Sequence, residues 1–341
     1  VDTTMPYFPV LYKGPNPAGT PGVTQQFAAL SETFSGFSGS LGATYNFTNR
    51  FLIKANIARG FRAPSIAELS ANGPDPGSQI YHVGNRDFRP EFSVQEDVGL
   101  ALNLTHLSAS VSLFDNHLQN YVFQEQIVDA NGNPVRVNPD GSPNPAGLYS
   151  KFTYVQSRAR IDGGEFYLDI HPVSWLHFEN SLTLTYGTNL IDGGKAPDSL
   201  KYLPFMPPPH THSELRATSA KGMGRFRSAY VFIGFDHYNP QSRYFAAYGT
   251  ETYTAGYNLL SAGLGVKLFS ATGKDIAELY IEGTNLGNSN YQSNMSRLKY
   301  FDNPVVPPGV QPGIFNMGRN VSFKILVPFD LSAKQHSSAG S

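Results

Sequence analysis

Apolar and polar side chains alternate along much of this chain, and the alternation is clearest near its end. Between Val321 and Phe329 every second residue is apolar, and Ser322 and Lys324 stand between apolar neighbours. A period of two residues predicts a β-strand with one apolar face and one mostly polar face. Similar segments precede this one. The eleven expected strands cover residues 37–47, 51–62, 94–104, 107–125, 152–172, 176–190, 202–219, 225–238, 258–269, 276–297 and 321–329.

Short turns and long polar loops connect these strands alternately. The short turns lie at 48–50, 105–106, 173–175, 221–224 and 271–274. The long loops are rich in Gly, Pro, Asn and Asp, and three of them, 71–91, 128–150 and 304–312, are expected to carry specificity. Short turns on one side of the bilayer and long loops on the other are typical of a membrane β-barrel. We therefore expect an all-β, antiparallel transmembrane barrel over residues 37–329.

The alternation also predicts which side chains face lipid. In strand 176–190 we expect Leu182, Leu184 and Tyr186 to face lipid, and Ser181, Thr183 and Thr185 to face the lumen. In strand 152–172 the polar residues again share one face. They are Glu165, Tyr167, Asp169 and His171, opposite Phe166, Leu168 and Ile170.

The composition agrees with strands that face lipid on one side only. Of the 341 residues 40% are hydrophobic and 13% aromatic, with a mean hydropathy of −0.27 and no apolar run as long as a membrane helix. Trp175 lies at a short turn, where membrane proteins carry aromatic belts. The net charge of −1 gives no basic footprint for a nucleic-acid partner. The absence of cysteine excludes disulfides and cysteine-ligated metals.

The two ends of the sequence differ from the strands between them. Residues 1–22 contain no secretory signal, although a barrel protein must be exported. Single-chain bacterial barrels have even strand numbers, so an odd number predicts a fragment from which the preceding strands are missing. We expect residues 1–36 to form an extracellular loop and the lead-in to the first strand. Residues 330–341 are expected to be a disordered tail.

Three polar residues of one expected strand, His210, His212 and Glu214, occupy alternate positions and so share a face. Two imidazoles and a carboxylate suit a transition metal. However, alternate residues of a strand lie about 6.6 Å apart, too far to share one ion easily. A hydrated barrel wall is therefore the favoured interpretation, and no metal site is predicted. GxSxG, HExxH and Walker motifs are absent, so no catalytic residue is expected.

Five segments in order resemble the C-terminal barrel half of TonB-dependent outer-membrane receptors, in the style of Bacteroidetes sequences. The second is close to the family pattern G-N-x-x-L-x-P-E, with Phe88 in place of the usual leucine. The segments are ARGFRAPSIAEL (58–69), VGNRDFRPE (83–91), YLPFMPPPHTHSEL (202–215), TNLGNSNYQSNMSRLKYF (284–301) and NMGRNVSFKILVPF (316–329).

The resemblance implies a 22-stranded barrel in the bacterial outer membrane, whose first eleven strands and plug domain are absent from this sequence. It also implies a transporter and not an enzyme, with no cofactor, that imports a scarce nutrient such as a ferric chelate. The TonB complex that supplies energy would contact an N-terminal segment outside this chain. The residues also offer candidate ligand contacts, namely the strand residues Arg59 and Arg62, as lumen candidates, and the loop residues Tyr81, His82, Tyr149 and Phe301. A hydrated barrel wall is the favoured interpretation for the two arginines, and a solvated loop is the favoured one for Tyr81 and His82.

Other functions stay open from the sequence. A passive porin would share the alternation, the turns and the aromatic belts. The loop aromatics would suit a glycan or a cobalamin as well as a ferric chelate. A barrel enzyme would need a nucleophile beside a base at the barrel rim, and no such pair stands out. A soluble β-sandwich would share the alternation but not the five family segments.

Overall fold

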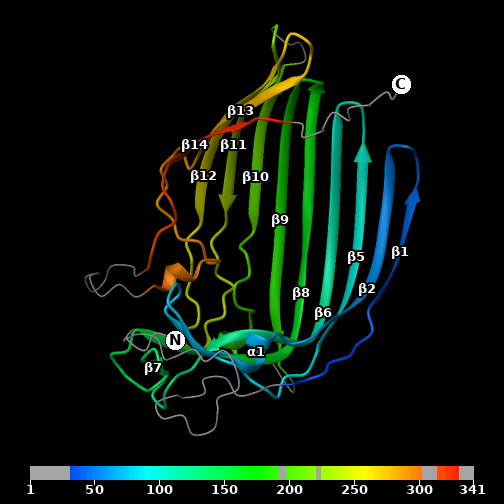
Figure 1. Cartoon of the computed structure of the whole chain (residues 1–341). Coiled ribbons are helices and arrows are strands. Elements are labelled where there is room, and N and C mark those ends of the chain that lie inside the picture. The colour runs from blue at the N-terminus through cyan, green and yellow to red at the C-terminus, as the bar shows by residue number, and fades with distance from the viewer. Residues whose placement is uncertain (1–30, 192–196, 220–223, 302–312, 330–341) are drawn as a thin grey trace, which may run out of the picture.

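The computed structural model describes residues 31–191, 197–219, 224–301 and 313–329. Eleven long strands lie side by side in chain order, and each pairs antiparallel with the next (Figure 1). This confirms the expected number and direction of the strands. They are β1 (Gly39–Asn46), β2 (Phe51–Arg62), β5 (Glu91–Asn103), β6 (Leu107–Gln126), β8 (Tyr149–Val173), β9 (Leu176–Leu190), β10 (His210–Thr218), β11 (Phe226–Tyr238), β12 (Tyr257–Phe269), β13 (Asp275–Thr284) and β14 (Asn320–Leu326). The tail at 330–341 and the loop at 304–312 lie outside the described residues.

Small elements occur inside the long loops. Helix α1 (Ile66–Ser70) begins at a capping box, because the Ser65 side chain accepts from the Glu68 N–H while the Glu68 carboxylate accepts from the Ser65 N–H. The other loop elements are β3 (Asn72–Asp75), β4 (Ile80–Val83), β7 (Arg136–Val137) and the 3₁₀ turns η1 (Asp198–Leu200), η2 (Ala247–Gly249) and η3 (Arg297–Tyr300). Within the described ranges, no helix is long and apolar enough to cross a membrane.

For two strands, the bound expected at one end is wrong. The strand expected at 202–219 begins only at His210, because residues 204 and 207–209 are prolines, which cannot donate to a strand ladder. The strand expected at 276–297 ends at Thr284. Asn285 adopts a left-handed backbone with φ of 47°, and its side chain accepts from the Ser289 N–H, which turns the chain away.

The register separates an apolar face from a polar face. Leu182 pairs with Phe166, and Leu184 pairs with Gly164, on the apolar side of the wall. Thr183 lies beside Glu165 and His210 on the polar side, so the predicted assignment of β9 is confirmed. Large exposed hydrophobic side chains cover the apolar face. They include Val98, Leu100, Leu113, Phe178, Val231, Ile233, Leu264, Ile281, Val321 and Phe323.

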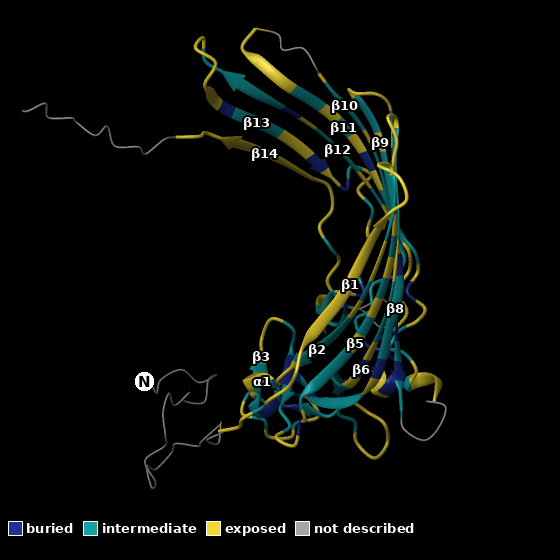
Figure 2. Ribbon diagram, turned by 90° about the vertical axis from the view of Figure 1, so that its right-hand side faces the viewer, coloured by how far each residue is buried: buried dark blue, intermediate teal, exposed yellow. Residues whose placement is uncertain are grey.

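The sheet is curved, and α1 and β3 lie on its concave side (Figure 2). Arg62, on the polar face, forms an ion pair of 2.9 Å with Glu68 of α1, which identifies the polar face as the concave one. The apolar face is convex, as a barrel wall in lipid requires. Between its apolar belt and the long loops, this face carries charged residues. There Arg160 of β8 donates to both carboxylate oxygens of Asp115 of β6, at 2.8 and 2.7 Å.

Tight side-chain packing is concentrated where the long loops meet the wall. One cluster joins Leu118 and Ala159 of the wall to Leu203 of the loop before β10. A second joins Phe123 of β6 to Phe245 and Ala247, in the loop between β11 and β12. A third, Tyr81, Val137 and Tyr149, lies between the loops themselves. These clusters fix the loops at one end of the wall, where they can form a binding site.

Candidate ligand-binding site

The long loops line a cavity of about 270 Å³ at the end of the wall opposite the short turns. Its lining comes from the loop before β4, the connection between β6 and β8, the loop around η2, and η3. Among the described residues that line it there are two arginines and no carboxylate, so the cavity favours an anionic group. Lining residues with polar, cationic or aromatic groups include Gln79, Gln126, Arg136, Phe152, Arg297 and Tyr300.

Arg297 lies between two aromatic rings in this cavity. Its guanidinium carbon is 3.9 Å from the centre of the Phe205 ring and 5.0 Å from the centre of the Phe152 ring. The Arg297 Nη2 donates to Gln124 Oε1 at 3.4 Å. Burial lowers the pKa of Arg297 to about 10, which still leaves the guanidinium charged at neutral pH. Cation–π contacts of this kind hold an arginine in place and leave its remaining donors for a ligand.

The lysine two residues further along anchors η3 beneath Arg297. Lys299 is only 3% exposed, and its ammonium donates to Thr252 O, Tyr253 O and Thr254 Oγ1 at 2.9, 2.8 and 2.7 Å. Burial lowers the pKa of Lys299 to about 8. The three bonds join the loop after β13 to the loop between β11 and β12. Arg297 is thereby presented from a rigid turn.

The buried carboxylate of Glu251 joins the loop that carries Phe205 to the loop between β11 and β12. Glu251 is 4% exposed and accepts from the backbone N–H groups of Phe205 and Phe245 at 2.8 and 3.1 Å. Burial raises the pKa of the Glu251 carboxyl. These bonds hold the ring of Phe205 against Arg297, so three separate loops contribute to one site.

The loop residues expected to bind ligand lie beside this cavity and not in its lining. Tyr81 is 2% exposed, donates to Asn72 Oδ1 at 2.7 Å, and packs with Tyr149 in a loop core. His82 stacks on Tyr154 with ring centres 6.3 Å apart. Burial, with the nearby charge of Arg297, lowers the pKa of His82. Phe301 follows η3, and its N–H donates to Leu298 O at 3.1 Å.

The two arginines expected in the lumen lie on opposite faces of β2. Arg62 is on the polar face, where it pairs with Glu68 and Glu91 at 2.9 and 3.0 Å and ties α1 to the wall. Arg59 is on the apolar face, opposite Val94, with its guanidinium 4.5 Å from the centre of the Phe92 ring. The lumenal placement of Arg59 is therefore wrong, because residues three apart on a strand point to opposite sides.

The three polar residues of β10 do share the lumenal face, but they do not form one cluster. His210 Nε2 and His212 Nδ1 each contact Asp236 Oδ1 of β11 at 2.9 Å. Glu214 instead accepts from Arg216 Nε at 2.7 Å. The spacing argument against a shared ion is in keeping with this arrangement. The partner of both histidines is Asp236 of the neighbouring strand, a contact that the sequence does not predict.

Sequence reasoning missed the residues that line the cavity. The sequence predicts Arg297 at the end of a strand, whereas that strand stops at Thr284 and Arg297 lies in η3. Arg136 sits in a loop without a recognisable motif, whereas Arg297 and Tyr300 lie in the family-like segment 284–301, which assigns them no role. Their only shared signal is that two cations and several aromatic residues stand in the long loops on which binding proteins place their specificity.

Comparison with known proteins identifies the wall and its loops. A family model described as "TonB dependent receptor-like, beta-barrel" matches residues 12–286. The chain belongs to this family. As a part of a TonB-dependent receptor barrel, it lies in the outer membrane, with its long loops outside the cell and its short turns in the periplasm.

Curated and solved relatives of this TonB-dependent receptor are distant. "Probable TonB-dependent siderophore receptor PirA" of Acinetobacter baumannii is 29% identical over 101 residues, which are 27% of this chain and 13% of that protein. "Hemoglobin and hemoglobin-haptoglobin-binding protein A" of Haemophilus influenzae is 30% identical over 94 residues, 28% of this chain and 8% of that protein.

Two solved structures show the same fold. "Copper transporter OprC" has a TM-score of 0.62 and 17% identity, over 84% of this chain and 39% of that one. The ferric enterobactin receptor PfeA of Pseudomonas aeruginosa has a TM-score of 0.53 and 19% identity over the same shares. The chain thus spans about two fifths of the length of these receptors.

Proposed function

We propose that the complete receptor imports a ferric chelate of the siderophore type across the outer membrane, with energy supplied by TonB. Membership of the receptor family supports transport in place of catalysis. The likeness to the siderophore receptor PirA and to the ferric enterobactin receptor supports a ferric chelate as the cargo. TonB would act through a segment outside this chain.

The observation that carries the proposal is the cationic, aromatic cavity among the long loops. Ferric complexes of catecholates and hydroxycarboxylates carry net negative charge, and catecholates add aromatic rings. Arg297 offers charge-assisted hydrogen bonds, Arg136 adds a second positive charge, and Tyr300 offers an aromatic ring. A volume of about 270 Å³ lies at the small end of ligand pockets. We infer that it holds one arm of the chelate and that other parts of the receptor contact the rest.

Growth of a deletion strain on single nutrient sources tests this function. The sources are ferric catecholate, ferric citrate, haem, cobalamin and host glycans, each supplied with and without a functional TonB. We expect the deletion strain to fail on one ferric chelate, and the gene to restore growth only when TonB is active. Rescue without TonB would establish a passive porin. Growth restored only on cobalamin or only on a glycan would show that this nutrient, and not a ferric chelate, is the cargo.

A further inference from the structure

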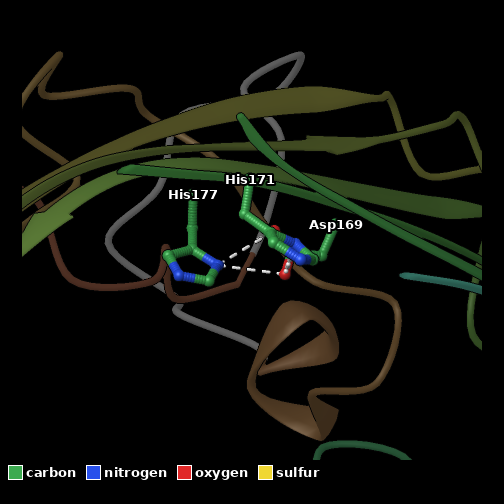
Figure 3. Close-up of side chains that lie close together, drawn as sticks. All are labelled: Asp169, His171 and His177. Carbon is green, nitrogen blue, oxygen red and sulfur yellow. Dashed lines mark hydrogen bonds and ion pairs between the residues drawn. The ribbon is translucent and has the colours of Figure 1, made fainter. Parts of the chain in front are cut away.

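Asp169, His171 and His177 gather on the lumenal face of the wall (Figure 3). They lie at the short-turn ends of β8 and β9, far from the loop cavity. Asp169 and His171 occupy alternate positions of β8, and His177 is near the start of β9, just after the short turn. Asp169 pairs with Glu179 in the register, which places both histidines on the same face. The cluster therefore lies within the last residues of the wall on the periplasmic side.

The three side chains converge on a single point. His171 Nδ1 is 2.9 Å from Asp169 Oδ2, and His177 Nδ1 is 3.0 Å from the same oxygen. The two imidazole rings are nearly parallel, with an interplanar angle of 25° and centres 5.2 Å apart. One ligand atom from each residue lies within 4.8 Å of those of the other two. Because His177 comes from the adjacent strand, the ligand atoms lie closer together than the spacing of about 6.6 Å between alternate residues of one strand would suggest.

These distances are close to those of a metal centre. Bonds of about 2.0–2.2 Å in a tetrahedral site place neighbouring ligand atoms about 3.3–3.5 Å apart. The two nitrogen–oxygen separations, 2.9 and 3.0 Å, need to widen by roughly half an ångström or less to match such a site. The ligand nitrogens of the two histidines already lie within 4.8 Å of each other. Two imidazoles and one carboxylate form a ligand set for divalent transition metals, and three protein ligands leave a position for water or cargo.

The charges around the cluster also favour a cation. Asp169 is 7% exposed, and its ion pairs among the described residues are both with histidines. Glu179 lies opposite Asp169, and Glu214 lies opposite Glu179 on the next strand. Arg216, opposite His177, directs its guanidinium to Glu214 and to the rings of Tyr230 and Phe232. Three carboxylates thus lie near one arginine, and that arginine pairs with Glu214 and not with Asp169.

We propose that Asp169, His171 and His177 bind a divalent transition-metal ion such as Zn²⁺, Cu²⁺, Ni²⁺ or Co²⁺ on the lumenal wall near the periplasmic mouth. Mg²⁺ and Ca²⁺ do not compete, because they prefer oxygen ligands. The site is separate from the loop cavity and holds a bare ion, so it stands whether or not the cargo is a ferric chelate. The competing arrangement is a hydrogen-bonded trio in which both imidazoles donate to the carboxylate.

Copper binding by the complete receptor tests the site. The protein is purified in detergent without a histidine tag, stripped with EDTA, and titrated with Cu²⁺ while electron paramagnetic resonance is recorded. We expect one bound Cu²⁺ per receptor, with superhyperfine coupling to two nitrogens. Zn²⁺ should displace it, whereas Mg²⁺ and Ca²⁺ should not. Failure to bind Cu²⁺ at micromolar concentration would overturn the proposal and support the hydrogen-bonded trio.

Single substitutions assign the ligands. His177→Gln should remove one nitrogen coupling and weaken affinity at least about tenfold, since even partners outside the ligand set change affinity by about 10–100-fold. His212→Gln is the matched control, because His212 is a lumenal histidine that also contacts an aspartate. Its spectrum should match that of the unaltered receptor. Loss of binding in the control, or an unchanged spectrum in His177→Gln, would refute the assignment. Heat-dependent mobility in electrophoresis reports that each variant is folded.

Discussion

At the scale of single residues, the site depends on side chains whose environment comes from distant parts of the sequence. Arg297 is held by Phe205, Phe152 and Gln124, from three other segments. A cation in an aromatic setting keeps its charge while losing solvent, which strengthens its attraction for an anion.

Replacement of Arg297 should weaken chelate binding. Arg297→Gln removes the positive charge from the cavity, and hydrogen bonds to charged groups contribute about 1.5–3 kcal/mol, so the affinity for an anionic ferric chelate should fall about 10–100-fold. Fluorescence titration of the purified receptor measures the change. Arg86→Gln, at an exposed loop position away from the cavity, is the control and should bind as the unaltered protein does. Equal affinity in both variants would remove Arg297 from the site.

Replacement of Phe245 should loosen the loops without opening the barrel. Phe245 is 0% exposed and meets Phe123 edge-on at 5.4 Å, so Phe245→Ala should cost the loop packing about 3–5 kcal/mol. Faster proteolysis of the loop between β11 and β12 would report this loss, with unchanged heat-dependent mobility of the barrel. Tyr253→Ala, at a residue 51% exposed in the same loop, should leave the proteolysis rate nearly unchanged.

At the scale of elements, each wall strand has two environments that alternate along its length. In β9, Leu184 lies in the apolar belt beside Gly164, and Thr183 lies in the lumen between Glu165 and His210. Two neighbouring residues of the strand therefore face different surroundings, one lipid and the other the water of the lumen.

This difference gives a stability prediction for β9. Leu182→Arg in the complete receptor should cost about 2–4 kcal/mol, because it places a charge beside Phe166 inside the lipid belt. Thr183→Arg should cost much less, since Glu165 and water can solvate the guanidinium. Denaturant unfolding of the receptor in lipid bilayers measures both free energies. Equal costs would show that the two faces are assigned in the wrong sense.

The strands could be predicted from the sequence because alternation is a local signal, and the loops could not. The eleven segments, the faces of β9 and the absence of long helices followed from residues a few positions apart. The start of β10 was missed although its prolines are visible, because the alternation of 210–218 was extended backwards through them. Loop positions depend on long-range contacts, such as Lys299 with Thr252 and Glu251 with Phe205, which no periodicity reveals.

At the scale of the whole molecule, the wall has two edges. Among the described strands, β1 and β14 stand at opposite ends of the sheet, and each pairs with one neighbour. Free strand edges carry unpaired backbone groups, which lipid does not tolerate. The wall therefore needs further strands before it can close around a lumen.

Expression of this chain alone should show that requirement. Refolded into lipid vesicles, residues 1–341 should give no heat-dependent mobility shift and should be digested by protease. The complete receptor, treated in the same way, should give the shift and resist digestion. A protease-resistant, heat-modifiable species from the chain alone would show that the two edges can pair, for instance between two copies.

The charged residues Asp115 and Arg160 on the convex face mark where lipid contact ends, and so they show how far the loop cavity lies from the membrane. Lipid contact ends near Gly164, where Asp115 and Arg160 follow, whereas the cavity is lined by Phe152 of the same strand. At about 3.3 Å per residue this is about 40 Å of strand, or about 30 Å of height at a typical tilt. Solutes therefore meet the mouth of the receptor in the surrounding medium, beyond the lipid headgroups. Capture should depend on diffusion from bulk solution and not on partition into the membrane.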